Sequence, residues 1–148
     1  MSIFSGLNAS ASALTANRLR MDVTASNIAN ANTTREQYVN GEWQPYRRKM
    51  VNIAPDSENQ FSTVFQKALN TNSTGVKVTG IEEDAEPFKL VYDPSHPDAN
   101  DQGYVQLPNV DPLKEMTDLM SASRSYEANV TALNATKGML VKALEIGK

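Results

Sequence analysis

The side chains best suited to chemistry lie in one turn-rich segment, residues 93–103. His96 is the single histidine of the 148-residue chain and is flanked by prolines. A metal site or a general base needs several converging partners, and one imidazole in a proline-rich loop supplies few. We therefore predict that His96 is a structural turn residue.

The same segment imitates the start of a calcium-binding loop. Asp98, Asn100 and Gln102 alternate, and Gly103 follows them. The twelfth position of such a loop holds a bidentate glutamate, but here it is Asn109. We predict a tight turn stabilised by Asp and Asn side chains, with weak calcium binding as the alternative.

Two short runs of charge stand in the middle of the chain. Arg47-Arg48-Lys49 predicts a strand edge or a solvated face, and the acidic run 82–86 predicts a solvated loop. The formal net charge of −3 and a pI of about 5.1 argue against nucleic acid as a partner. A basic partner surface for the acidic run is the weaker alternative.

The sequence lacks the motifs of the common enzyme classes. It has no phosphate-binding loop, no glycine-rich dinucleotide fingerprint, no nucleophile elbow and no paired-histidine motif. It also has no cysteine, which excludes disulfides, thiolate zinc ligands and a thiol nucleophile. We predict no catalytic residues, no cofactor and no metal site, and hence a protein that is not an enzyme.

Membrane insertion and a cleaved signal peptide are also unexpected. No apolar stretch approaches the length of a membrane span. Residues 1–6 carry no basic region, and no apolar region of the length found in signal peptides follows them. If the protein leaves the cytoplasm, we expect it to use another export route.

The carboxy-terminal run from about Pro112 to Ile146 predicts a long helix. Asp111 can cap it and Pro112 suits its first turn. At about 1.5 Å per residue it would be roughly 45–50 Å long, so it needs a partner to cover its apolar side. Its spacing of three and four residues is that of a heptad seam, formed by Met116, Leu119, Ser123, Tyr126, Val130, Leu133, Lys137, Leu140 and Leu144.

Residues 1–32 predict a second helix with the same seam spacing, formed by Leu7, Ala11, Leu14, Arg18, Met21, Ala25 and Ile28. Both seams contain small or charged residues, and the other faces are rich in Asn, Ala, Ser and Thr. Such faces suit close packing against several neighbours, so we expect these helices to become ordered chiefly on assembly. We predict an assembly interface made of the larger apolar members: Leu7, Leu14, Met21, Ile28, Met116, Leu119, Tyr126, Val130, Leu133, Leu140 and Leu144.

Alternation of apolar residues predicts strands in the middle of the chain, at 45–53, 76–81, 88–92 and 104–107. A short amphipathic helix is predicted at 61–69 and a loop at 33–44. The fold class is therefore α+β, with two long terminal helices that pair as an antiparallel coiled coil. The expected domains are 1–34 with 111–148, the paired helices that form the assembly core, and 35–110, a small β-rich insertion.

Several motifs resemble those of bacterial flagellar rod and hook proteins. The first helix contains ASASALTA at 9–16 and MDVTASNIANANT at 21–33, and the last helix contains SASRSYEANV at 121–130. In the middle, VKVTGI at 76–81 and VYDPSHPDAN at 91–100 are similar to the proximal-rod members of the flagellar basal-body rod protein family. The resemblance spans nearly the whole chain, although residues 34–38 depart from the turn usual in relatives.

This resemblance implies a structural subunit of the flagellar proximal rod. Such subunits polymerise helically into the drive shaft that transmits torque from motor to hook and encloses the export channel. The implied partners are further copies of the chain, other rod subunits and the flagellar export apparatus. The implied location is the periplasmic rod of the basal body. The alternative from the residues alone is a soluble coiled-coil adaptor or binding module, which would need charged flanking positions and a stable free dimer.

Overall fold

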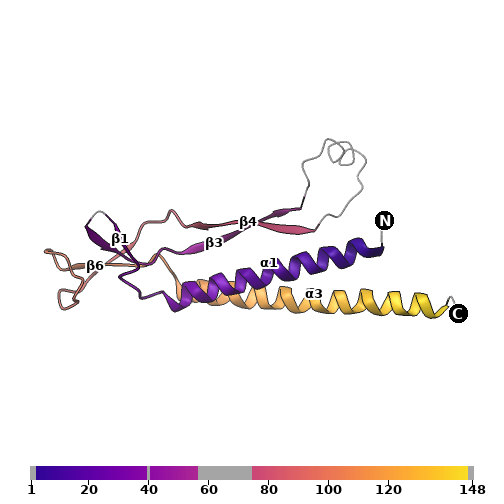
Figure 1. Cartoon of the computed structure of the whole chain (residues 1–148). Coiled ribbons are helices and arrows are strands. Elements are labelled where there is room, and N and C mark those ends of the chain that lie inside the picture. Colours follow the sequence, from indigo (N-terminus) through magenta and orange to yellow (C-terminus); the bar gives the residue numbers. More distant parts are fainter. Residues whose placement is uncertain (1–2, 40, 57–74, 147–148) are drawn as a thin grey trace, which may run out of the picture. The chain divides into compact units, whose positions relative to one another are not determined.

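The computed structural model describes residues 3–39, 41–56 and 75–146 (Figure 1). Two long helices bracket three pairs of strands. The helix predicted at 61–69 lies outside the described residues. The helices are α1 (Ile3–Ala29) and α3 (Pro112–Ile146); the strands are β1 (Gln37–Val39), β2 (Glu42–Gln44), β3 (Lys49–Pro55), β4 (Val76–Glu83), β5 (Lys89–Tyr92) and β6 (Tyr104–Leu107).

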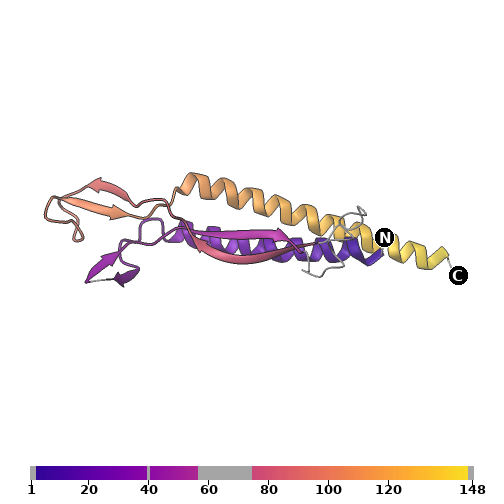
Figure 2. The same ribbon diagram turned by 90° about the horizontal axis from the view of Figure 1, so that it is seen from above.

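The predicted pairing of the terminal helices is confirmed. The chain falls into two units, each of which takes a part of α1 and a part of α3. Within each unit the two helical parts lie side by side and run in opposite directions (Figures 1 and 2). The fold is therefore α+β, with a small β-rich insertion between two long helices.

Local hydrogen bonds mark the start of α3 and the end of α1. Asp111 caps α3, because its carboxylate accepts the Leu113 N–H at 3.0 Å, and Pro112 occupies the first position as predicted. At the end of α1, the Asn30 side chain donates to the carbonyl of Ser26 at 3.0 Å. The Thr33 N–H donates in turn to the carbonyl of Asn30, which bends the chain away from the helix axis.

The first unit comprises Met1–Leu19, Asn52–Gly80 and Ser121–Lys148. Its buried apolar side chains among the described residues are two alanines, Ala16 and Ala122. Ser12 joins α1 to the start of β4, because its hydroxyl accepts the Val76 N–H at 3.1 Å. A side chain at Gly75 would overlap that hydroxyl, so the small residues of this unit permit a close approach of helix and strand.

The second unit comprises Arg20–Val51 and Ile81–Met120 and contains two antiparallel hairpins. β5 pairs with β6 in the register Tyr92 opposite Tyr104, and their rings meet edge to face with centroids 5.3 Å apart. β1 pairs with β2, and Tyr38 lies opposite Trp43 with ring centroids 5.2 Å apart. In the described residues β3 pairs with β4 alone.

In the middle of the chain, three strands agree with the prediction from the sequence, and two segments differ from it. The strands predicted at 76–81, 88–92 and 104–107 are confirmed as β4, β5 and β6. The loop predicted at 33–44 is wrong, because this segment contains the β1–β2 hairpin, where Gly41 has the positive φ (93°) of a tight turn. The strand predicted to begin at Pro45 begins at Lys49, because the N–H groups of Tyr46 and Arg48 bond outside any strand.

The turn between β5 and β6 requires glycine at one position. Gly103 has a φ of 78°, and a methyl group there would lie 2.9 Å from the Tyr92 ring. We expect Gly103→Ala to lower the free energy of unfolding by about 2 kcal/mol, because it combines backbone strain with overpacking. Gly80→Ala is the matched control, since Gly80 has open space around it. Equal unfolding midpoints for the two variants in urea would contradict this account.

Candidate functional site

The chemistry-bearing turn of residues 93–103 is a structural turn, as predicted. His96 accepts the Asp98 N–H at its Nδ1 atom, at 3.1 Å. Asp98 is engaged by the Arg35 guanidinium and by the Thr34 hydroxyl, which lower the pKa of its carboxyl. The side chain of Asn100 accepts the backbone N–H of Gln102. The carboxylate of Asp98 and the side-chain oxygen of Asn100 are therefore already bonded to protein donors.

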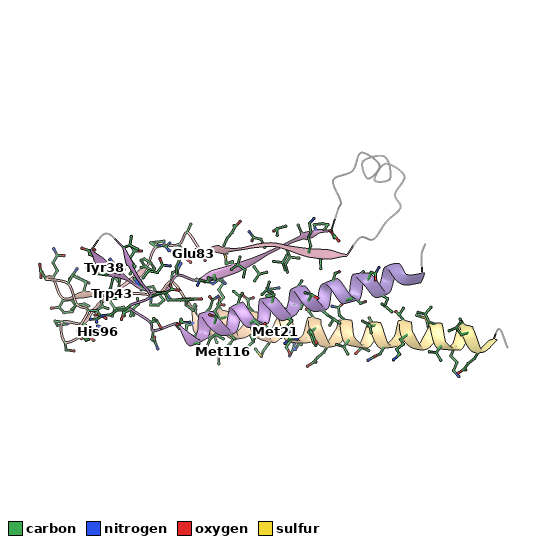
Figure 3. The ribbon with its side chains drawn as sticks, viewed as in Figure 1. Met21, Tyr38, Trp43, Glu83, His96 and Met116 are labelled. Carbon is green, nitrogen blue, oxygen red and sulfur yellow. The ribbon has the colours of Figure 1, made fainter. Side chains whose placement is uncertain are left out.

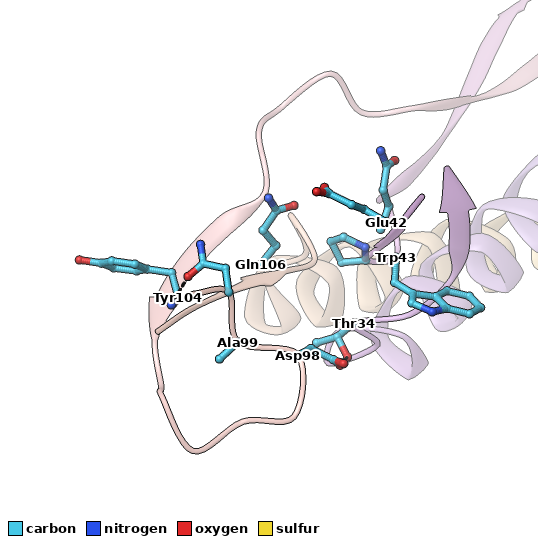
Figure 4. A pocket seen from close by; sticks show the side chains of 10 residues that line it. Thr34, Glu42, Trp43, Asp98, Ala99, Tyr104 and Gln106 are labelled. Carbon is cyan, nitrogen blue, oxygen red and sulfur yellow. Dashed lines mark hydrogen bonds between the residues drawn. The ribbon is translucent and has the colours of Figure 1, made fainter. Parts of the chain in front are cut away.

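A shallow groove of about 380 Å³ adjoins this turn (Figure 4). It is lined by parts of the β1–β2 hairpin and of β6, including Trp43, Asp98 and Gln106. The Tyr104 ring points away from Trp43 (Figure 4). The Thr34 hydroxyl donates to Asp98 within the groove, but Arg35 also binds this carboxylate and its pKa is lowered, which makes it a weak base. In the described ranges, moreover, no group of three or more acidic or histidine side chains could hold a metal ion. The groove offers no catalytic arrangement.

The second unit contains a network of hydrogen-bonded polar side chains that are buried or partly buried. We call this network the polar junction. Its members are Asn27, Tyr46, Arg48, Asp84, Asn109 and Glu115. Asn27, which is 1% exposed, makes four hydrogen bonds. Its amide group donates to the Lys49 carbonyl and to Glu115 Oε2, both at 2.9 Å. Its oxygen accepts the Lys49 N–H at 3.0 Å and the Tyr46 hydroxyl at 2.9 Å. This is the full hydrogen-bonding capacity of an asparagine.

Arg48 is the charged centre of the polar junction. Its Nε atom donates to Glu115 Oε1 at 2.7 Å, and its Nη1 atom donates to Asp84 Oδ2 at 3.1 Å. Its Nη2 atom lies 3.8 Å from Asp118 Oδ2. Burial alone would lower the pKa of Arg48, but the hydrogen bonds with Glu115 and Asp84 outweigh it and the pKa is raised. Arg48 therefore remains charged and holds carboxylates from two segments.

Asn109 completes the polar junction from the segment before α3. Its side-chain oxygen accepts the Arg48 N–H at 2.8 Å, and its amide donates to the Glu86 carbonyl at 3.0 Å. Every buried side-chain nitrogen and oxygen in the described part of the chain has a hydrogen-bond partner. Because a half-satisfied network would be costly, this completeness indicates that one geometry is specified.

The polar junction corrects two predictions from the sequence. For Arg47-Arg48-Lys49 the predicted strand edge fits Lys49, which opens β3. The alternative of a solvated face is wrong for Arg48, because its side chain is 13% exposed and paired with carboxylates. Its neighbour Arg47 lies over the Phe88 ring, 4.4 Å from the centroid. Asp84 is not simply part of a solvated loop, because Arg48 binds it. The flanking Glu82 and Glu83 are exposed, as predicted, but they belong to β4 and not to a loop.

Stability should fall in acid because of Asp84. The backbone N–H of Glu86 and then the Arg48 guanidinium lower the pKa of this carboxyl. A lowered pKa in the folded state contributes stability that is present above the ordinary value of about 3.9 and is lost as the pH falls through the folded value. We expect Asp84→Asn to reduce the fall in melting temperature between about pH 5 and pH 3. The exposed Asp101→Asn is the control, and equal pH profiles for the two variants would refute the assignment.

The predicted interface residues take two positions. Nine are partly buried along the two helices: Leu7, Leu14, Met21, Ile28, Leu119, Tyr126, Val130, Leu133 and Leu140. Met116 and Leu144 are exposed, at 54% and 76%, and Figure 3 marks Met116. The inward position next to Met116 belongs instead to Glu115 of the polar junction.

α3 carries large apolar side chains on its exposed surface in both units. Leu113, Met116 and Met120 follow each other at helical spacing in the second unit. Met139, Val141 and Leu144 lie near the end of the helix in the first unit. All six are at least 46% exposed. Leu113, Met116 and Met120, at spacings of three and four, share one face of α3, and a row of exposed apolar side chains of this kind marks a surface that other molecules cover.

The polar side chains of the helices largely bond to their own helix. The hydroxyls of Thr15, Thr131 and Thr136 donate to carbonyls one turn earlier at 2.9–3.2 Å. The Asn129 amide donates to the Ser125 carbonyl at 2.8 Å. A neighbour that covered these faces would therefore leave few polar donors without partners.

Two family models match the ends of the chain. The model described as flagella basal body rod protein matches residues 7–35. The model described as flagellar basal body rod FlgEFG protein C-terminal matches residues 101–146. The matched ranges contain most of α1, all of α3 and several polar-junction residues. No helix in the described ranges is both long and apolar enough to cross a membrane.

Curated relatives match over the whole length. A flagellar basal-body rod protein FlgC of Bacillus subtilis is 62% identical over 151 residues, covering 100% of both chains. The FlgC of Borreliella burgdorferi is 43% identical and covers 99% of this chain and 98% of the relative. The FlgC of Salmonella typhimurium is 40% identical over 100% of both chains.

Proposed function

Because the chain belongs to the FlgC family of flagellar basal-body rod proteins, we propose that it polymerises helically into the drive shaft of the flagellum. It is a structural subunit of the rod and not an enzyme, and it assembles with other rod subunits. The proposed shaft transmits torque from motor to hook and encloses the export channel.

The observation that carries this proposal is the exposed apolar surface of α3. Leu113, Met116 and Met120 would each lose favourable burial if they stayed in water, at about 25 cal/mol per Å² of apolar area. Neighbouring subunits in a shaft would cover them. The internally bonded Thr and Asn side chains of the helices support the same conclusion, since covering them costs little.

We assign the assembly core to residues 1–34 and 111–148, and the contacts that fix lateral spacing to residues 35–110. In the core, the predicted interface residues would pack between α1 and α3 and against neighbouring subunits. The exposed pair Tyr38 and Trp43 gives the middle segment an aromatic surface of its own (Figure 3). Many weak contacts of this kind would sum to a stiff shaft.

We further propose that the flagellar export apparatus carries the subunit to the periplasm unfolded and without a cleaved signal peptide. In the described ranges few large side chains are buried, which supports this route, because a weakly stabilised subunit unfolds readily. Neither nucleic acid nor insertion into a membrane has a part in this mechanism. The acidic pI of about 5.1 fits the absence of a nucleic-acid partner.

Electron microscopy of purified basal bodies tests this function. A small epitope tag after Gln102, in the exposed turn between β5 and β6, would be marked with gold-labelled antibody. We expect label on the rod, between the motor and the hook. Label confined to the cytoplasmic side, or a soluble dimer that never enters basal bodies, would overturn the proposal in favour of an adaptor.

A further inference from the structure

The polar junction has a role beyond holding the second unit together. We propose that Arg48 is a positioning residue for assembly. With Asn27 and Glu115 it fixes the register of α1 against α3 and so sets the direction in which α3 presents Leu113, Met116 and Met120. This inference rests on the proposed function.

Apolar packing specifies the register of this helix pair poorly. The fully buried helical residues of the second unit are Thr24, Asn27 and Glu115, all polar. The buried apolar residues of the two helices are Ala16 and Ala122, which lie in the first unit. Alanine surfaces tolerate sliding, whereas a buried polar group with fixed partners penalises every register but one.

The hydrogen bonds of Asn27 show what a change of register would cost. A shift of α1 by one turn, about 5.4 Å, would bring Val23 to the place of Asn27. The side chain of valine cannot form hydrogen bonds, so the backbone groups of Lys49 and the Oε2 atom of Glu115 would lose their partner. A shift of α3 by one turn in one direction would bring Leu119 to the place of Glu115 and leave Arg48 without that carboxylate. The opposite shift would bring Asp111, whose side chain is one methylene shorter.

The register matters for assembly because the exposed apolar residues share turns of α3 with Glu115. Leu113 and Met116 lie within two positions of it. Once Glu115 is held by Arg48 and Asn27, the rotation of the first turns of α3 is set, and with it the direction of Leu113, Met116 and Met120. A slipped helix would present them elsewhere.

The test replaces polar side chains by apolar side chains of similar size, because substitution with alanine would leave a larger cavity. The variant Asn27→Leu/Arg48→Met/Glu115→Leu replaces the three residues of the polar junction that link α1 to α3 by apolar residues of similar volume. Because the natural chain has no cysteine, spin labels can be placed uniquely at Ala25→Cys and Thr117→Cys, both exposed and both in the second unit. Electron–electron distances are then measured in the free, full-length subunit.

We expect one narrow distance distribution in the labelled natural chain. The apolar triple variant should fold but melt at a lower temperature, because the Lys49 backbone groups and the Tyr46 hydroxyl lose Asn27. It should show a broadened or double distribution and enter rods at least tenfold less often. Arg48→Lys, which keeps a cation near Glu115, should retain the narrow distribution. A narrow, unshifted distribution in the triple variant, with normal entry into rods, would overturn the inference.

If the triple variant fails to fold, a double variant replaces it in the test. Arg48→Met/Glu115→Leu leaves Asn27 bonded to the Lys49 backbone and to the Tyr46 hydroxyl, and the same distances are measured in it. If this variant also unfolds, the polar junction serves stability and not register, and the inference is lost. Since the distances come from the free subunit, failure of the natural chain to enter rods would count against the proposed function alone.

Discussion

Replacing Glu115 by alanine should lower the free energy of unfolding of the subunit by roughly 3–5 kcal/mol. The carboxylate is 1% exposed and is bonded to Arg48 through one oxygen and to Asn27 through the other. Its removal leaves a buried guanidinium without its nearest carboxylate and an asparagine N–H without an acceptor. For a chain of this length the loss corresponds to roughly 6–20 °C in melting temperature, measured by circular dichroism.

The control for this prediction is an ion pair on the surface of the same helix. Glu145 is bonded to Lys142 at 2.7 Å, but both side chains are more than half exposed. Glu145→Ala should therefore change the free energy of unfolding by less than about 1 kcal/mol. Similar losses for Glu115→Ala and Glu145→Ala would mean that the polar junction is no more important than a solvated pair.

Either Leu14→Asp or Leu133→Asp should abolish assembly. Both leucines are partly buried in the first unit, where the described core is otherwise made of alanine. A carboxylate there must be desolvated without a partner, which exceeds what the weak contacts of this unit can offset. We expect a non-motile strain and no rods when either variant replaces the natural protein. The second unit should still fold, as judged by the near-ultraviolet signal of Trp43.

The neighbouring substitution Asn134→Asp separates burial from charge. Asn134 is exposed on the same helix, and its replacement adds the same charge one position along. We expect assembly to be weakened much less by Asn134→Asp than by Leu133→Asp. Normal swimming by strains carrying Leu14→Asp and Leu133→Asp would refute the account of the helix pair.

The helices were predictable because their periodicity extends over 27 and 35 residues. Which residues of these helices face inward was harder to predict. A heptad places Met116 in the seam, whereas Glu115 is the buried residue. In the second unit α1 also contacts β3, because Asn27 bonds to the backbone of Lys49. The covered face of this helix is therefore wider than a coiled-coil seam.

The polar junction could not be derived from sequence patterns. Glu115 meets Asn27 across 88 positions and Arg48 across 67 positions. A lone Asn or Glu in an amphipathic helix predicts a solvated face, and three basic residues in a row predict the same. The β1–β2 hairpin is different, because Asn40-Gly41 between Tyr38-Val39 and Glu42-Trp43 was a usable turn signal.

Hydrogen exchange, measured residue by residue on the free subunit and on purified rods, tests the central claim most directly. That claim is that the long ends of α1 and α3 complete their packing only against neighbouring subunits. We expect residues 121–146 to exchange rapidly in the free subunit and slowly in the rod, while residues 112–120, held by the polar junction, are protected in both. Slow exchange along all of α3 in a dilute, monomeric subunit would contradict the claim.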